Sequence, residues 1–346
     1  MADVLVLGIS HYPMLIWPDK AMSGLLQKML TNPNLPEALK TPAGWPEAMQ
    51  KEWSDDQGEA AAAKHRQEMM DWTRQARQAL DDFNPDFVLI WGDDQYENFK
   101  EDIIPPYCIN AYPEFRFHNF PNNIWGEPVE KEFVLPGVQQ AAKHLTTKLI
   151  EAGFDVPYSY KRLHHALGHA FTNAIFYLDY DRKGFNYPIL PISINCYGRQ
   201  VIAQKGGLPS FDKELSEDQL DPPAPTPGRL FDLGAETARI LAESPHRVAL
   251  IASSSWSHAF LTKKTHYLWP DIPADKVLFD AMVAGDFDVW RNYTSAQIED
   301  SGQQEVLNWS CLVGALSALG RTKPDIAGFV DTWIFNSCKA FLVSKP

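Results

Sequence analysis

The stretch DFVLIWGDDQYENF, residues 86–99, carries the clearest information about the fold. Its first half is a continuous apolar run that follows Asn84-Pro85, and such runs are typical of strands buried on both faces of a parallel sheet. Five polar side chains then follow almost together: Asp93, Asp94, Gln95, Glu97 and Asn98. Open α/β sheets bind ligands beyond the carboxyl ends of their strands. The second half of the stretch is therefore a candidate metal or substrate site.

Similar signals recur along the chain. Three further apolar runs predict strands: VLVLGIS (4–10), YPILPISIN (187–195) and RVALIASSS (247–255). Four segments have helical spacing or helix stop signals: 59–83, 137–153, 227–244 and 303–320. Alternating strands and helices predict an α/β fold with one central, mainly parallel sheet covered by helices on both faces. We treat 1–346 as a single domain with loop insertions near 31–57, 105–127 and 205–227.

Composition limits the possible partners. The chain has 31 basic and 44 acidic residues, a net charge of −13, which argues against nucleic acid or an anionic membrane as its partner. We expect no membrane span, because no apolar run approaches the roughly 18 residues that one needs. The N-terminus enters a strand without a basic segment, so we expect no signal peptide. Four scattered cysteines fit reduced thiols in a cytoplasmic protein.

Three further residues lie at predicted strand ends or at the start of a predicted helix. His11 follows the first strand, His258 follows the strand near residue 250, and Glu305 begins a helix. Each alone has an ordinary structural interpretation, as a core hydrogen bonder or a helix-dipole partner. Gathered at one edge of a sheet, His11, Glu305 and one more ligand would form the face that non-haem iron(II) oxygenases use. His258, outside that face, could then serve as an acid–base catalyst.

Several segments in order resemble the signature segments of the class III extradiol dioxygenases, whose type is the LigB-like β-subunit of protocatechuate 4,5-dioxygenase. They extend over nearly the whole chain except the insertions. The segments are GISHYP, DFVLIWGDDQYENF, ALGHAFTNAI, PILPISINCYG, the helix that begins PGR, SSSWSHAF and GQQEVLNWSCLVGAL. The resemblance implies that His11 and Glu305 bind metal, that His258 is the acid–base histidine, and that His169 is a catalytic histidine near the substrate.

The second metal histidine of that family has no histidine counterpart here. Gln95 stands at its position, in Asp93-Asp94-Gln95. Three hypotheses remain: a His-Gln-Glu site in which the weaker amide oxygen coordinates the metal, a site shifted to Asp94 or Glu97, or a site that has lost its metal. We favour Gln95 as the third ligand.

The resemblance also implies a reaction. We expect an oxidoreductase that binds Fe(2+), with Mn or Zn as alternatives, and uses O2 to open the ring of a catechol- or aminophenol-like aromatic substrate. Tyr12, Asn195 and Arg199 are candidate substrate contacts, and Arg199 could pair with a carboxylate. The insertions are candidate lids, and we expect a homo-oligomer, a dimer. The alternatives are a metal-dependent hydrolase or lyase, a non-catalytic partner subunit of a dioxygenase, and a purely structural protein.

Overall fold

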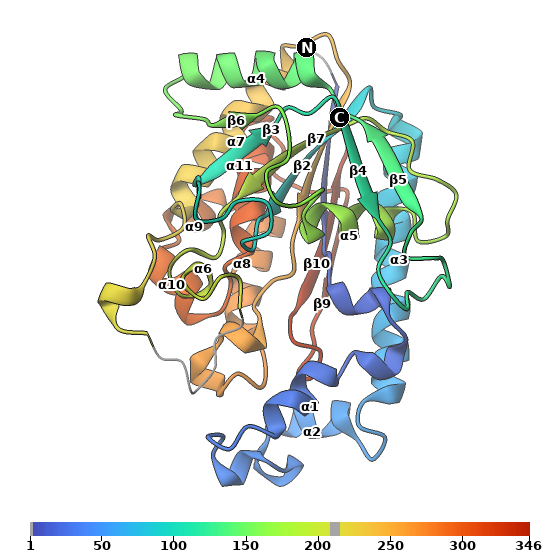
Figure 1. Ribbon diagram of the computed structural model, residues 1–346, viewed down its shortest axis with the longest axis vertical. Coiled ribbons are helices and arrows are strands. Elements are labelled where there is room, and N and C mark those ends of the chain that lie inside the picture. The colour runs from blue at the N-terminus through green and yellow to red at the C-terminus, as the bar shows by residue number, and fades with distance from the viewer. Residues whose placement is uncertain (1–2, 208–214) are drawn as a thin grey trace.

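The computed structural model describes residues 3–207 and 215–346 and has an eight-stranded sheet at its centre (Figure 1). The strand order is β6-β3-β7-β2-β8-β1-β10-β9. Its strands are β1 (Val4–Ile9), β2 (Phe87–Asp93), β3 (Tyr107–Asn110), β6 (Tyr158–Ser159), β7 (Ile189–Ile194), β8 (Val248–Ser253), β9 (Ile326–Val330) and β10 (Lys339–Ser344). A separate antiparallel pair joins β4 (Glu114–His118) and β5 (Glu132–Pro136).

The four middle strands are parallel. β7, β2, β8 and β1 pair side by side, with Trp91 opposite Ile192 on one side and Ala252 on the other. Antiparallel pairing occurs toward the edges, between β3 and β7 and among β1, β10 and β9. Because the middle strands run the same way, their carboxyl ends share one edge of the sheet, where the chain places its polar residues.

Helices cover both faces, as Figure 1 shows. α3 (Glu59–Phe83) and α5 (His169–Leu178) pack on one face. α7 (Pro227–Ala242) and α11 (Val306–Ala318) pack on the other, with α4 (Gln139–Glu151) beside them. The remaining helices are α1 (Gly24–Leu30), α2 (Glu47–Trp53), α6 (Gly198–Ala203), α8 (Ile272–Ala284), α9 (Phe287–Asn292) and α10 (Ser295–Asp300).

Two apolar cores lie on opposite sides of the sheet. Successive side chains of a strand point to opposite faces, so Val4 and Val6 join the core under α7 and α11. Leu5 and Leu7 join the core under α3 and α5. A strand that is buried on both sides has no polar alternation, which is why these segments read as continuous apolar runs.

The predicted α/β class, the four predicted strands and the four predicted helices are confirmed within a few residues at their ends. The 105–127 segment, which we expected to be an irregular insertion, instead contains β3 and β4. β3 is four residues long and gives too short a pattern to recognise. The 31–57 insertion carries α2 and short 3-10 turns. The 205–227 insertion lies in part outside the described residues.

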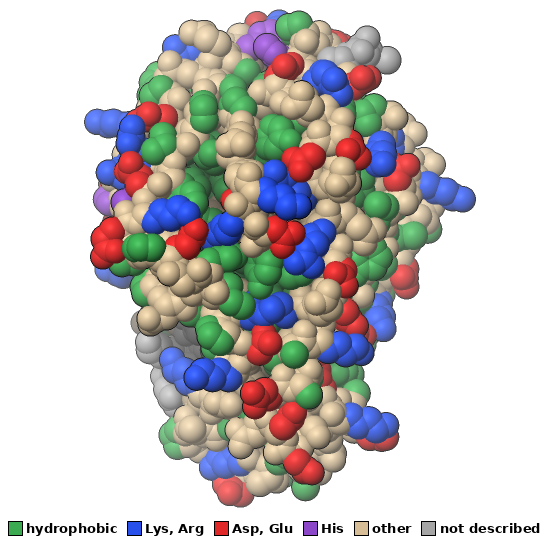
Figure 2. Space-filling view, turned by 90° about the vertical axis from the view of Figure 1, so that its right-hand side faces the viewer, with side chains coloured by type: hydrophobic (Ala, Val, Ile, Leu, Met, Phe, Trp, Pro, Cys, Tyr) green, Lys and Arg blue, Asp and Glu red, His purple; other side chains and the backbone are tan. Residues whose placement is uncertain are grey.

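The surface carries side chains of both charges. On the face drawn in Figure 2, basic and acidic side chains are interspersed, with hydrophobic side chains among them. Among the described residues, no helix has the length and apolar character needed to cross a membrane.

A tight contact under β1 provides a test of the fold. A Cβ added at Gly8 would lie 2.2 Å from Cη2 of Trp309, a fully buried ring that packs against Trp256 at 5.2 Å between centroids. We expect Gly8→Ala to destabilise the protein by about 1–3 kcal/mol, as overpacked cores do, measured by urea denaturation. Gly24→Ala is the control, because nothing lies within 4 Å of its added Cβ. Equal midpoints for both variants would contradict this packing.

Candidate metal centre

Four ionisable side chains meet at the carboxyl edge of the sheet. They are His11 after β1, Asp93 at the end of β2, His169 at the start of α5 and Glu305 just before α11. Each offers one nitrogen or oxygen atom, and these atoms lie within 4.8 Å of one another. His11 Nε2 is 3.2 Å from Glu305 Oε2, and His169 Nε2 is 3.7 Å from Asp93 Oδ2. Two imidazoles and two carboxylates thus converge from four separate elements.

His11 is held so that one ring nitrogen faces this cluster. Its Nδ1 lies 3.0 Å from Ser253 Oγ, and the Ser253 hydroxyl donates to the Ala170 carbonyl at 2.7 Å. With its proton used there, Ser253 Oγ accepts a hydrogen bond from His11 Nδ1–H. Nε2 is then the ring nitrogen that faces the cluster, and it makes no hydrogen bond within the described part of the chain.

His169 is oriented in the same way by Glu97. The Glu97 carboxylate accepts hydrogen bonds from the backbone N–H of His169 at 3.1 and 3.2 Å and lies 3.0 Å from its Nδ1. This places an anion at the N-terminus of α5, where the helix dipole favours it. Gly168 permits the approach, because a Cβ there would lie 2.8 Å from Glu97 Oε2. Nε2 of His169 is left facing Asp93.

Burial and charge act in opposite directions on His169. Burial lowers the pKa of His169, but the carboxylates of Glu97, Asp93 and Glu305 outweigh burial and raise it to about 10. In the absence of a metal, this ring is therefore protonated at neutral pH.

Glu305 is the most heavily contacted member. It is 2% exposed, and its Oε2 accepts the backbone N–H of Ser255 at 2.8 Å. Its Oε1 accepts the hydroxyl of Tyr197 and lies 3.2 Å from Nε2 of His258. Burial would raise the pKa of Glu305, but the charges of His258 and His11 hold it well below its usual value. The carboxylate is kept ionised inside the protein.

Asp93 belongs to this cluster, although the sequence did not single it out as a candidate ligand. It shares a face of β2 with Leu89 and Trp91, which belong to the core under α11, and Asn308 of α11 donates to its Oδ1 at 3.4 Å. Burial, and then the charge of Glu305, raises the pKa of Asp93 to about 7. Its Oδ2 makes no hydrogen bond among the described residues. Its place directly after the apolar run, as the last residue of β2, is the signal that could have identified it.

These unpaired atoms fit a cation. Asp93 Oδ2 and His11 Nε2 are buried atoms with no hydrogen-bond partner in the described chain, and most buried polar atoms in native proteins have one. Carboxylate oxygens and imidazole nitrogens are ordinary ligands of divalent first-row metals. The cluster is therefore a candidate centre for one divalent metal ion.

The other residues considered after β2 have different contacts. The amide of Gln95 donates to the Gly206 carbonyl at 2.9 Å. Asp94 accepts the backbone N–H groups of Glu97 and Asn98 at 2.9 and 3.0 Å, so it closes the turn after the strand. Neither is among the grouped side chains, and Glu97 acts through His169.

All three expected substrate contacts have partners within the protein. Tyr12 is 1% exposed, donates its hydroxyl to the Met22 carbonyl at 3.2 Å and lies under the buried ammonium of Lys339. Asn195 Oδ1 accepts the N–H of Gly198 at 3.0 Å. Arg199 is partly exposed and pairs with Glu217 at 2.7 Å.

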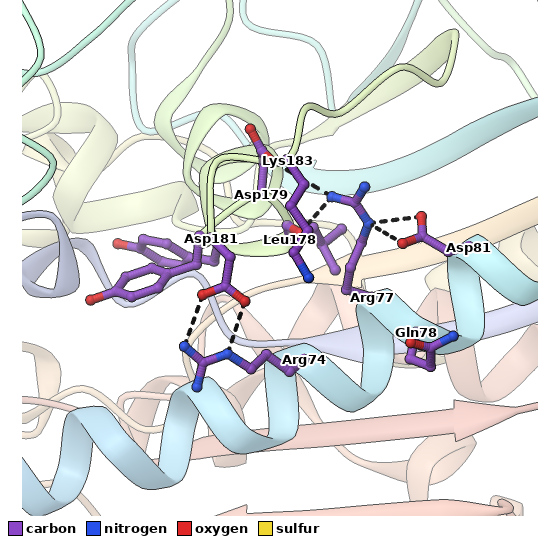
Figure 3. A pocket seen from close by; sticks show the side chains of 10 residues that line it. Arg74, Arg77, Gln78, Asp81, Leu178, Asp179, Asp181 and Lys183 are labelled. Carbon is purple, nitrogen blue, oxygen red and sulfur yellow. Dashed lines mark hydrogen bonds and ion pairs between the residues drawn. The ribbon is translucent and has the colours of Figure 1, made fainter.

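One surface cavity of about 230 Å³ is lined by residues other than the four grouped side chains. It is bordered by α3 and the segment after α5 (Figure 3). Its charges pair with each other, Arg74 with Asp181 at 2.9 Å and Arg77 with Asp81 at 2.8 Å. None of the four grouped side chains lines it.

Comparisons with known proteins identify distant relatives. The chain is 24% identical over 189 residues to a 2,3-dihydroxyphenylpropionate/2,3-dihydroxicinnamic acid 1,2-dioxygenase of Photorhabdus laumondii, which covers 54% of this chain and 47% of the relative. It is 25% identical over 192 residues to the enzyme of that name, numbered 2, from Pseudomonas putida, covering 55% and 49%. A Rhodococcus enzyme of the same name is 25% identical over 272 residues, covering 71% and 81%.

The similarity to the first two relatives covers part of each protein. The chain spans about half the length of the first curated relatives that it matches. No family model matches the chain. The solved structure of an uncharacterised Escherichia coli protein, JW3007, aligns with 78% of this chain and 91% of its own, at 12% identity and a TM-score of 0.41.

The link between Glu97 and His169 can be tested by titration of the metal-free protein. Glu97→Gln removes the nearest anion, so we expect the pKa of His169 to fall from about 10 toward its ordinary value of 6.5, measured by NMR of the ring. Because the pKa of His169 is higher in the folded than in the unfolded protein, its protonation stabilises the fold fully below pH 6.5. This stabilisation is lost as the pH rises through about 10. The stability difference between parent and variant should therefore shrink between pH 6.5 and 10.

Asp102→Asn is the matched control, because it removes the carboxylate 2.9 Å from the exposed His164 instead. An unchanged His169 titration in Glu97→Gln would show that this carboxylate does not set the charge of the ring.

Proposed function

We propose that His11, His169, Asp93 and Glu305 hold one divalent metal ion. The observation that carries the proposal is that each histidine has its Nδ1 occupied, by Ser253 and by Glu97, while its Nε2 faces the two carboxylates. Metal-binding histidines commonly present one nitrogen to the metal and the other to a carboxylate or hydroxyl group. His169 would thus supply the second imidazole that is missing at Gln95.

On this basis we propose a non-haem iron(II)-dependent dioxygenase of the extradiol type, a LigB-like enzyme that opens the ring of a catechol-like or aminophenol-like substrate. The distant relatives support this class, since their names describe dioxygenases of aromatic diols. Two histidines and one carboxylate are the ligands of many non-haem iron oxygenases. When bound, iron(II) would supply Lewis acidity toward the diol and a path for electrons to dioxygen.

The chain's own residues would handle protons. His258 is 3% exposed, its Nε2 lies 3.2 Å from Glu305 Oε1, and its Nδ1 has no hydrogen-bond partner among the described residues. Nδ1 is thus free to accept a proton from a substrate hydroxyl and later to return it. Tyr197 and Ser255 hold the Glu305 carboxylate in place by donating to it, so that it remains a fixed anion.

A second candidate function is a hydrolase or lyase that uses zinc or manganese. It is favoured by Asp93, which adds a second carboxylate to the expected three ligands. Metal analysis of protein purified without oxygen separates the two functions. About one iron per chain, with oxygen consumed when a catechol is added, supports the dioxygenase, whereas zinc or manganese without oxygen uptake supports the alternative.

The identity of the oxygen ligand can be tested by an isosteric pair. Asp93→Asn removes a ligand charge from the cluster, so iron(II) affinity should fall at least tenfold in a titration of metal-free protein under nitrogen. Asp94→Asn is the control, since the neighbouring carboxylate binds backbone N–H groups. Gln95→Ala should bind iron as the parent does. Loss of iron in Gln95→Ala with full binding in Asp93→Asn would return the ligand role to Gln95.

His258 should prove catalytic and not a ligand. We expect His258→Ala to retain iron but to lose about 10²–10⁴-fold in turnover, the usual contribution of an acid–base group. The measurement pairs metal content with oxygen uptake on a catechol. Loss of the metal in this variant would make His258 a ligand, and normal turnover would remove it from the mechanism.

A further inference from the structure

Asp275, in α8, is a buried carboxylate on which three segments of the chain converge. Its two oxygens each accept the backbone N–H of Ser257 at 3.1 Å. Its Oδ1 also accepts the side-chain amide of Gln303 at 2.7 Å, and the thiol of Cys338 donates to the same carboxylate. Asp275 is not one of the four grouped side chains. It therefore joins three segments without belonging to the metal cluster.

Two of these segments carry residues of the proposed chemistry. Ser257 directly precedes His258, and Gln303 lies two residues before Glu305. Between the two segments, Nε2 of His258 lies 3.2 Å from Oε1 of Glu305. Because Asp275 binds both segments next to these residues, its carboxylate sets how His258 and Glu305 lie relative to each other.

The third segment lies against His258 itself. The backbone N–H of Trp256 donates to the Cys338 carbonyl at 2.9 Å, and His258 forms an isolated β-bridge with Ser337. The Cys338 thiol links this segment to Asp275. Asp275 therefore contacts both the loop that carries His258 and the segment that supports this loop.

Stability alone does not account for a carboxylate at this position. Burial raises the pKa of Asp275 from 3.8 to about 7, although the donated hydrogen bonds act in the opposite direction. The ionisation of Asp275 therefore lowers the stability of the fold as the pH rises from 3.8 to about 7. In native proteins, residues that cost stability in this way are expected at functional sites.

We propose that Asp275 is a positioning residue that keeps the imidazole of His258 against Glu305, with Nδ1 turned to the substrate. It acts through Ser257 and Gln303 and does not itself exchange a proton with the substrate. The inference rests on the proposed function, because that function gives His258 its role in proton transfer. A displacement of about 1 Å can cost ~10²-fold in rate, so the loss of these hydrogen bonds should lower turnover.

A double-substitution cycle in the iron-loaded enzyme tests whether Asp275 acts through His258. Asp275→Ala should lower kcat for a catechol about 10²-fold. Iron content and KM should stay as in the parent, since Glu305 keeps its bonds to Tyr197 and Ser255. In a His258→Ala background the same change should have no further effect, because the group that it positions is gone. An equal loss in both backgrounds overturns the proposal.

Asp275→Asn provides a second variant if the alanine variant does not fold. Asparagine retains one acceptor oxygen but replaces the other with an NH2 group, so the N–H of Ser257 loses part of its acceptor. We expect kcat to fall about tenfold. The urea midpoint above pH 7 should be no lower than that of the parent, because a buried charge is removed. A lower midpoint with unchanged kcat would make Asp275 a structural residue and overturn the proposal.

The metal-free protein gives a measurement that does not depend on iron or turnover. With isotope-labelled histidine, the His258 ring should give one set of NMR signals in the parent, because Asp275 and Glu305 hold it in one orientation. In Asp275→Asn these signals should broaden or double. Those of His169, which Glu97 orients, should stay as in the parent. Unchanged His258 signals overturn the proposal.

Asp179→Asn is the matched control. Asp179 is also a buried carboxylate whose pKa is raised by burial, and it accepts a backbone N–H, that of Gly184, at 2.7 Å. It lies at the end of α5, away from the loop that carries His258. Asp179→Asn should therefore leave kcat and the His258 signals unchanged, and a loss of kcat equal to that of Asp275→Asn would overturn the proposal.

These measurements separate the inference from the proposed function. If the parent does not cleave a catechol but the NMR pattern holds, the proposed function fails and the positioning of His258 by Asp275 stands. If the parent cleaves a catechol and Asp275→Ala is as harmful without His258 as with it, the positioning role fails and the dioxygenase stands.

Discussion

Two ionisable carboxyl groups, Asp93 and Glu305, are buried at one edge of the sheet, and this constraint organises the residues around them. A buried anion is costly unless cations or hydrogen-bond donors compensate it. Glu305 receives a backbone N–H, a tyrosine hydroxyl and two histidines, so its pKa is held low. Asp93 receives one weak amide bond and lies 3.7 Å from Nε2 of His169, but burial and the charge of Glu305 still raise its pKa to about 7. The uncompensated part of this charge is what a divalent cation would neutralise.

The middle of the fold could be predicted from the sequence because its signals are local. β1, β2, β7 and β8 are buried on both sides and therefore read as apolar runs. The edges could not be predicted in the same way. β3 and β6 are four and two residues long, and β10 reaches its place beside β1 by antiparallel pairing of segments more than 300 residues apart. Such pairing depends on the tertiary structure and leaves little trace in a short window.

The candidate site was predictable in part for a related reason. His11 and Glu305 follow from their positions at the ends of a strand and the start of a helix, and the structure brings both into the cluster. Gln95 was predicted from its position in a motif and lies beyond the end of β2, whereas Asp93 is the last residue of that strand and contacts α11 through Asn308. The orientation of His169 depends on Glu97, which lies 72 residues away in the sequence. No local pattern could show that contact.

Gln95 has a structural partner at the start of the 205–227 insertion. Its side-chain amide donates to the carbonyl of Gly206, at the start of the 205–227 insertion. Gly206 has a φ of +77°, and a Cβ added there would lie 2.5 Å from the backbone carbonyl oxygen of Gln95. A side chain is therefore excluded at Gly206 on both counts. The same insertion brings Glu217 to Arg199. A glutamine after β2 thus holds the start of this insertion through its side chain, and in the proposed metal site the second imidazole would come from the N-terminus of α5.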